Sequence, residues 1–428
     1  MKLWDKGYST DNLVEKFTVG NDRILDMKLA KYDVQGNRAH ARMLTSIGLL
    51  TYQEFADIDR GLNDILADIE AGTFTIEEQF EDIHSKVEFE LTKKIGEAGK
   101  KIHSARSRND QVLVDLHLYT KDELTEIKQL IANVFHTLIS LADEHKNTLL
   151  PGYTHLQVAM PSSFGLWFSA YAESLVDDLY FINAAYKIAD QNPLGSGAGY
   201  GSSFPINRSM TTKELGFETM KYNVVAAQMS RGKLEKSVAM ALSSVAGTMS
   251  KFAADVCLYM SQNFGFVGFP KELTTGSSIM PHKQNPDVFE LMRAKCNKVQ
   301  NLPTEIAMIT NNLTSGYFRD LQLLKESYME GIDLLKDNLE VLDFMLKHIE
   351  VKTGIVDDNK YDFLFSVEEL NKMVLNGESF RDAYQKLGKQ ILNGNFNPEK
   401  TVNHSHEGSI GNLCLKEIRE KFDNALKF

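Results

Sequence analysis

Hydrophobic residues recur through the middle of the chain at steps of three and four positions, the period of a helix that packs along one side. The stretch 111–150 contains neither Gly nor Pro, and its apolar seam runs from Leu113 to Leu141. Other long periodic stretches are 162–190, 233–261, 287–310 and 320–350. Because these stretches far exceed the usual helix length of about 11–12 residues, they predict a bundle of long helices.

Signals for other folds are weak. No run of alternating β-branched residues is bounded by a hairpin turn, and no self-similarity at about 34 or 40 residues indicates a repeat scaffold. We therefore expect an all-α fold with a long-helix bundle, which also serves oligomerisation, at 111–350. A helical domain at 1–110 and a small helical domain at 351–428 flank it. The helix that starts after Pro286 should kink near Pro303.

Composition agrees with this fold. Only 9 of the 428 residues are proline, against a usual share of about 5%, so long stretches can stay helical. The 43% hydrophobic and 25% charged residues are ordinary for a globular protein and exclude a disordered chain. A formal net charge of −11 argues against a general nucleic-acid or anionic-membrane binder.

Cysteine usage and the start of the chain indicate the compartment. Cys257, Cys296 and Cys414 form no CxxC pair, which argues against a disulfide framework or a zinc site and favours a reducing environment. The first residues lack an apolar signal segment, and the most apolar window, 237–249, is too short and too rich in serine to span a membrane. We therefore expect a cytoplasmic protein.

Polar and glycine-rich segments separate the predicted helices, and functional residues on a rigid bundle should lie in them. These segments are 99–110, 151–161, 192–232, 264–286 and 311–319.

The segment 264–286 has the composition of an anion-binding loop. Three glycines allow tight turns, Ser277 and Ser278 offer hydroxyls and accessible amides, and Lys283 adds a positive charge. The helix that begins after Pro286 has an N-terminus that favours negative charge. Such a loop suits a carboxylate or a developing oxyanion, although an ordinary surface loop explains the same composition.

The string GSSIMPHKQNP at 276–286 resembles the signature loop of the fumarase/aspartase superfamily, whose members release fumarate from a succinyl moiety. Further strings resemble the argininosuccinate lyase branch of that superfamily, in the same order and over nearly the whole chain. They are LWDKGYSTDNLVEKFT at 3–18, YDVQG at 32–36, HSARSRNDQV at 103–112, GYTHLQ at 152–157, PLGSGAGYG at 193–201 and YFRDLQLLK at 317–325.

This resemblance implies cleavage of argininosuccinate to arginine and fumarate without cofactor or metal. A base removes a proton from the carbon next to a carboxylate, and an acid protonates the departing nitrogen. The resemblance implies Ser277 as the base, with Lys283 stabilising its alkoxide. It implies His155 as the acid or proton shuttle, held by Glu290. Read alone, Ser277 would be an ordinary loop hydroxyl and His155 a polar cap of the bundle.

Binding roles follow from the same strings. The residues expected to hold the succinyl carboxylates are Ser107, Arg108, Asn109, Thr154, Lys283 and Asn285. The residues expected to meet the arginine half are Arg231, Tyr317, Gln322 and Lys325, and His84 matches a further active-site position. Without the resemblance, most of these residues read as plain helix surface.

Departures from the family pattern concern the amino-acid half of the substrate. Ser230 stands before Arg231 where Asp is usual, and Phe318 replaces a polar residue. A modified argininosuccinate is therefore an alternative substrate. The alternative functions are another fumarate-releasing lyase, of the adenylosuccinate lyase or aspartase type, and an inactive crystallin-like protein. His404 and His406 are interpreted as solvated rather than as metal ligands.

The first long helix separates two groups of expected site residues. Arg108 precedes it and His155 follows it, and about 37 residues at about 1.5 Å each span about 55 Å. One small substrate cannot touch both ends, so a shared site requires antiparallel bundles from different chains. The resemblance implies a homotetramer in which three chains form each site.

Overall fold

The computed structural model describes residues 11–427 and confirms the expected all-α class. Positions 3–10 of the string at 3–18 lie outside the described residues. The α-helices are α1 Asn12–Val19, α2 Asp22–Leu25, α3 Ala30–Ser46, α4 Tyr52–Glu70, α5 Ile83–Ile95, α6 Glu97–Lys100, α7 Arg108–Glu144, α8 Phe164–Ala189, α9 Arg208–Glu214, α10 Val224–Gln228, α11 Lys233–Tyr259, α12 Asp287–Thr310, α13 Leu324–Leu346, α14 Ser366–Leu375, α15 Phe380–Leu392 and α16 Leu415–Leu426. The strands are β1 Leu149–Thr154, β2 Gln157–Ser163, β3 Gln191–Asn192, β4 Thr219–Met220, β5 Val267–Gly268 and β6 Glu350–Val351.

The five long helices lie where the hydrophobic period predicts them, with differences at their ends. Helix α7 has 37 residues but ends at Glu144, earlier than expected. Helix α13 begins only at Leu324, because a 3₁₀ turn occupies Arg319–Leu323. Helix α12 contains Pro303 in its interior, and the expected kink there stays a prediction.

The segment 151–161, expected to be a loop, is an antiparallel hairpin formed by β1 and β2. Pro151 pairs with Pro161 and Thr154 pairs with Gln157, with an irregular register between Pro151 and Tyr153. The loop prediction was wrong because prolines and a glycine, which weaken strands, stand inside both halves of the hairpin. The turn also lacks the Asn-Gly or Gly signal that usually marks a hairpin.

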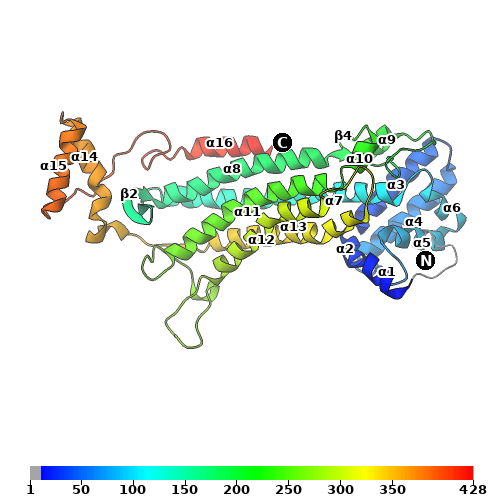
Figure 1. Cartoon of the computed structure of the whole chain (residues 1–428), viewed down its shortest axis with the longest axis horizontal. Helices are drawn as coiled ribbons and strands as arrows, with labels where there is room; N and C mark the ends of the chain where they lie inside the picture. The colour runs from blue at the N-terminus through cyan, green and yellow to red at the C-terminus, as the bar shows by residue number, and fades with distance from the viewer. Residues whose placement is uncertain (1–10, 428) are drawn as a thin grey trace. The chain divides into compact units, whose positions relative to one another are not determined.

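The chain forms two compact units. The first contains the residues up to Ile127, Phe181–Ser244 and Lys298–Leu335. Here α3, α4 and α5 pack side by side (Figure 1) around a cluster that includes Leu44, Leu62 and Leu91, all fully buried. This packing fixes the segment before α5 and the start of α7, which carry several expected site residues.

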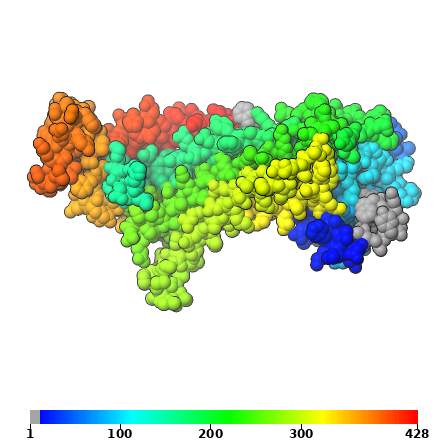
Figure 2. Space-filling view, viewed as in Figure 1, coloured from blue at the N-terminus to red at the C-terminus, as the bar shows by residue number. Residues whose placement is uncertain are grey.

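The second unit contains Lys128–Tyr180, Val245–Asn297 and the residues from Lys336 onward. Trp167 stacks on Phe252 with ring centroids 5.1 Å apart, and the indole N–H donates to Asp255 at 3.0 Å. Between α11 and α12 the chain leaves the helices, and Figure 2 shows this yellow-green segment projecting from the unit. Ile279 on this segment is 86% exposed.

Each of the five long helices contributes residues to both units, so the units do not follow the order of the chain. The division into three domains at about 110 and 350 stays a prediction. Between residues 11 and 427, no helix is long and apolar enough to cross a membrane.

Candidate active site

Two side chains cap the start of α7. The backbone N–H of Ser107 donates to Asp110 Oδ1 at 2.9 Å, and the Ser107 hydroxyl accepts from the N–H of Asn109 at 3.3 Å. This reciprocal cap satisfies amides that the first turn of a helix cannot pair internally. Ser107, Arg108 and Asn109 are therefore held at a rigid helix start.

The glycine-rich segment 193–201 docks on the same cap. Asp110 Oδ2 accepts from the N–H groups of Gly195 at 3.1 Å and Gly197 at 2.8 Å. Both glycines have positive φ, and a Cβ on Gly195 would lie 2.8 Å from Arg208, so a side chain would be excluded there. Burial raises the pKa of Asp110 to about 6, although these donors favour its charged form.

A cavity of about 240 Å³ opens beside this helix start in the first unit. The expected site residues that line it are His84, Arg108, Asn109, Arg231, Tyr317, Gln322 and Lys325. The other lining residues are Asp22, Asp26, Glu81, Asp82, Val112 and Arg319. Segments more than 200 residues apart thus meet at one site, as the resemblance requires.

Each arginine of the cavity has an acidic partner. Arg108 bonds Glu81 at 3.2 Å and also Asp82, while Arg319 reaches the other oxygen of Glu81 at 2.5 Å. Arg231 is held more deeply, with its Nε 2.8 Å from Glu235. These pairs hold the guanidinium groups in place and offset most of their charge.

Lys325 is paired differently from the arginines. Its Nζ lies 2.7 Å from Asp22 Oδ1 and 2.7 Å from Asp26 Oδ1, so one cation serves two carboxylates. Burial lowers the pKa of Lys325, but the two carboxylates outweigh it and the net pKa is raised. Burial raises the pKa of Asp22 to about 6 despite the adjacent ammonium.

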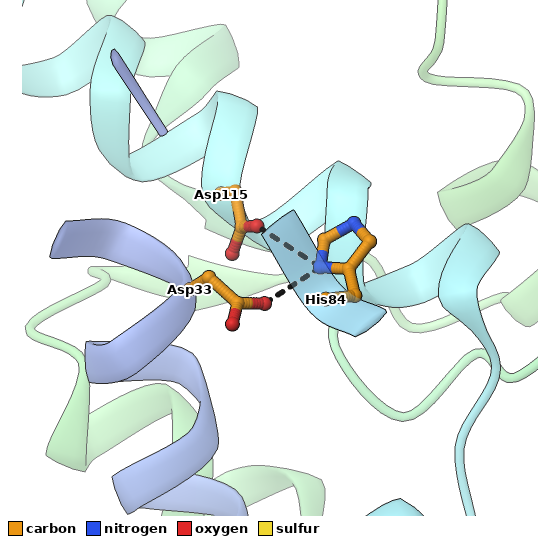
Figure 3. Close-up of side chains that lie close together, drawn as sticks. All are labelled: Asp33, His84 and Asp115. Atoms are coloured by element: carbon orange, nitrogen blue, oxygen red, sulfur yellow. Dashed lines mark hydrogen bonds and ion pairs between the residues drawn. The ribbon is translucent and has the colours of Figure 1, made fainter. Parts of the chain in front are cut away.

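Two aspartates stand behind His84 (Figure 3). Its Nδ1 lies 2.6 Å from Asp33 Oδ1 and 3.7 Å from Asp115 Oδ2, and all three side chains are buried. Burial alone would lower the pKa of His84, but Asp33 and then Asp115 raise it above its ordinary value. Burial, followed by repulsion from Asp33, raises the pKa of Asp115. The cavity wall therefore carries a histidine that favours its cationic form.

Within residues 11–427, Asp33, His84 and Asp115 are the set whose potential metal-ligand atoms lie within 4.8 Å of one another. Two ligands about 2.1 Å from one ion normally lie about 3 Å apart. The 2.6 Å between His84 and Asp33 is instead the length of a charge-assisted hydrogen bond. The geometry is thus that of a hydrogen-bonded histidine–carboxylate pair rather than that of ligands around a metal ion. His404, elsewhere in the chain, pairs with Glu368 at 3.0 Å.

Ser277 lies on the projecting segment of the second unit. Its hydroxyl oxygen accepts from the N–H groups of Ile279 at 3.3 Å and Met280 at 3.1 Å. Asn285 closes the loop by donating its backbone N–H to Thr275 O at 2.8 Å. Two amides aimed at one hydroxyl oxygen stabilise negative charge there.

His155 lies at the tip of the β1–β2 hairpin. His155 and Leu156 both have positive φ, 53° and 57°, where a two-residue hairpin turn usually has Asn and Gly. Non-glycine residues rarely adopt this conformation, and such strain tends to persist at functional sites. The turn exposes both side chains and the neighbouring Thr154.

Lys283 and Glu290, which are expected beside Ser277 and His155, are exposed in the single chain. Within residues 11–427, the Lys283 ammonium makes no hydrogen bond or ion pair, and none joins His155 to Glu290. The expected contact between His155 and Glu290 is therefore not made inside this chain.

The residues that sequence reasoning missed are the acidic members of the cavity, Asp22, Asp26, Glu81 and Asp82, together with Arg319. Glu81 and Asp82 lie three and two positions before His84 and could have been found from that proximity. Asp22 and Asp26 carry no such signal, because isolated acids are common in an acidic chain.

Comparison with known proteins identifies the family. A family described as lyase matches residues 6–301. The argininosuccinate lyase of Bacteroides fragilis is 58% identical over 417 residues, which cover 97% of this chain and 93% of that protein. The chain belongs to the argininosuccinate lyase family. This membership confirms the branch that the sequence strings indicated.

A more distant member of the family, from Thermotoga neapolitana, is 42% identical over 389 residues, covering 91% of this chain and 98% of its own. Among solved structures, an EDDS lyase in complex with formate matches with a TM-score of 0.80, covering 98% of this chain and 90% of its own. At 20% identity, this likeness establishes the shared fold.

Proposed function

We propose that this chain catalyses the reversible elimination that cleaves argininosuccinate to L-arginine and fumarate, a step of arginine biosynthesis. The observation that carries the proposal is the cavity of the first unit. It brings together His84, Arg108, Arg231 and the segment 317–325, which are far apart in sequence and match one family. The cations there suit a substrate with carboxylates, and the acids suit its cationic groups.

The chemistry assigns Ser277 as the base that removes a proton from the succinyl carbon. The two amides directed at its oxygen, with the nearby uncompensated Lys283, support this role by stabilising an alkoxide. The exposed position of the loop suits closure over a bound substrate, which would exclude water. No cofactor or metal enters the proposed reaction.

His155 then protonates the departing guanidinium nitrogen, with Glu290 orienting it. Because this contact is absent within the chain, we assign it to neighbouring subunits. The 37 residues of α7 correspond to a length of about 55 Å, which supports a site built from several chains. A homotetramer, with three chains at each site, meets this requirement. We place the enzyme in the cytoplasm.

The decisive experiment follows fumarate absorbance with argininosuccinate, adenylosuccinate and aspartate offered in parallel. We expect fumarate from argininosuccinate alone. Release from one of the other substrates instead would indicate another superfamily lyase, and no release from any would support the inactive crystallin-like alternative. A Ser277→Ala variant controls for contaminating lyase, and its activity should fall by about a thousandfold or more.

A further inference from the structure

We propose that Glu235 is a positioning residue, which acts through Arg231 to hold residues 316–325, here called the wall segment, at the cavity of the first unit. Only the kinetic consequence rests on the proposed function, because the position of the wall segment can be measured without substrate. The basis is a buried chain of contacts that joins the start of α11 to this segment.

Both carboxylate oxygens of Glu235 are bonded inside the protein. Oε1 accepts from Arg231 Nε at 2.8 Å, and Oε2 accepts from the backbone N–H of Gly232 at 2.7 Å. Glu235 is 1% exposed and is not among the residues that line the cavity. Any effect of Glu235 on a ligand there must therefore pass through its partners.

Arg231 connects this carboxylate to the wall segment. Its Nη2 donates to the backbone O of Leu321 at 2.6 Å, 90 positions further along the chain. Because the Nε and Nη2 groups of one planar guanidinium donate in fixed directions, the Glu235 carboxylate sets where this second hydrogen bond can point. The Leu321 carbonyl is thereby fixed relative to the start of α11.

The wall segment has a cavity on each of its two faces. On one face, the residues that line the cavity of about 240 Å³ are Tyr317, Arg319, Gln322 and Lys325. On the other face, the residues that line a second cavity of about 140 Å³ are Gly316, Phe318 and Leu321. Since space remains behind the wall segment, side-chain packing alone does not determine its position. A polar anchor on its backbone is needed.

The other polar contacts of the wall segment do not replace this anchor. Arg319, Gln322 and Lys325 bond through long side chains, to Glu81, to the last carbonyls of α1 and to two aspartates. Such side chains rotate about several bonds, so they can keep their contacts while the backbone shifts. The bond from Arg231 holds the backbone itself, and its loss should let the segment move into the space behind it.

The test compares wild type with Glu235→Gln and uses Asp178→Asn as the control. Asp178 is also a buried acid, 3% exposed, but it belongs to the second unit, where it accepts from the Thr248 hydroxyl at 2.7 Å. Hydrogen exchange followed by mass spectrometry, without ligand, should be about tenfold faster in the wall segment of Glu235→Gln. In Asp178→Asn this segment should exchange as in wild type.

Steady-state kinetics with argininosuccinate shows whether the site depends on this anchor. The KM of Glu235→Gln should rise about tenfold while kcat changes less than about threefold, because the wall segment lines the cavity and the proposed base and acid lie on other segments. Asp178→Asn should keep the KM of wild type.

Glu235→Gln leaves the buried Arg231 without its counter-ion, which can prevent folding. The double variant Arg231→Met with Glu235→Gln removes both charges together, which proteins often tolerate, and it still lacks the donor to Leu321. It should show the same faster exchange and the same higher KM.

Unchanged exchange of the wall segment, in whichever of these two variants folds, would overturn the inference. Faster exchange with an unchanged KM would overturn it as well, and so would a loss of kcat alone. If wild type releases no fumarate from argininosuccinate, the proposed function fails, while the exchange measurement still decides whether Glu235 holds the segment.

Discussion

The substitution Asp110→Asn tests how the start of α7 is held. Asp110 is fully buried and accepts three backbone N–H groups, from Ser107, Gly195 and Gly197. Its pKa is raised from 3.8 to about 6 by burial. A raised carboxyl pKa stabilises the fold fully below pH 3.8, and this contribution is lost as pH rises through about 6.

The magnitude follows from linkage between folding and protonation. With these two pKa values, the contribution of Asp110 to wild-type stability is on the order of 1 kcal/mol larger at pH 5 than at pH 7.5. Asparagine does not titrate, so the stability of Asp110→Asn relative to wild type should rise by about that amount over the same interval. Asp110→Ala should show the same pH behaviour but be about 2 kcal/mol less stable than Asp110→Asn, because the asparagine carbonyl oxygen can still accept from the N–H groups of Gly195 and Gly197, whereas alanine offers no acceptor.

The assay is urea unfolding of the three proteins at pH 5 and pH 7.5, at one protein concentration because an oligomer's stability depends on it. If the difference between wild type and Asp110→Asn stays constant between the two pH values, the linkage argument is refuted. If Asp110→Ala is as stable as Asp110→Asn, the hydrogen bonds to the glycine-rich segment do not contribute as reasoned.

Three further outcomes follow from the structure. Leu156→Gly should raise the unfolding free energy by about 1 kcal/mol because φ is 57° there, and a lower melting temperature would contradict the strained turn. Mixing subunits of His155→Asn and Ser277→Ala should restore activity if the two residues come from different chains, and properly mixed oligomers without recovery would exclude that allocation. Asp33→Asn should lower the pKa of His84 in an NMR titration, since it removes the nearest carboxylate, and an unchanged pKa would contradict that electrostatic account.

The long helices were predictable because the helical period depends only on residues that are close together in the sequence. An apolar seam such as that of α7 needs only residues three and four apart, and all five long stretches proved helical. The β1–β2 hairpin was not predictable in the same way. Pro151 and Gly152 oppose a strand, and only pairing with the segment at Pro161 stabilises one.

The residues of the candidate site also differ in whether the sequence could predict them. Residues within contiguous strings, such as Ser277 in its loop or Arg108 beside Asn109, could be named from the resemblance. The acidic partners of Lys325 could not. Asp26 lies 299 positions from Lys325, and no local pattern links the two.

The sequence by itself determined the helical class, the family and the identity of the main candidate groups, because periodicity and contiguous strings are local properties. Only the tertiary structure decided the charge state of the site. It placed two carboxylates on Lys325, two behind His84 and two beside Arg108, since electrostatic pairing depends on distance in space and on burial.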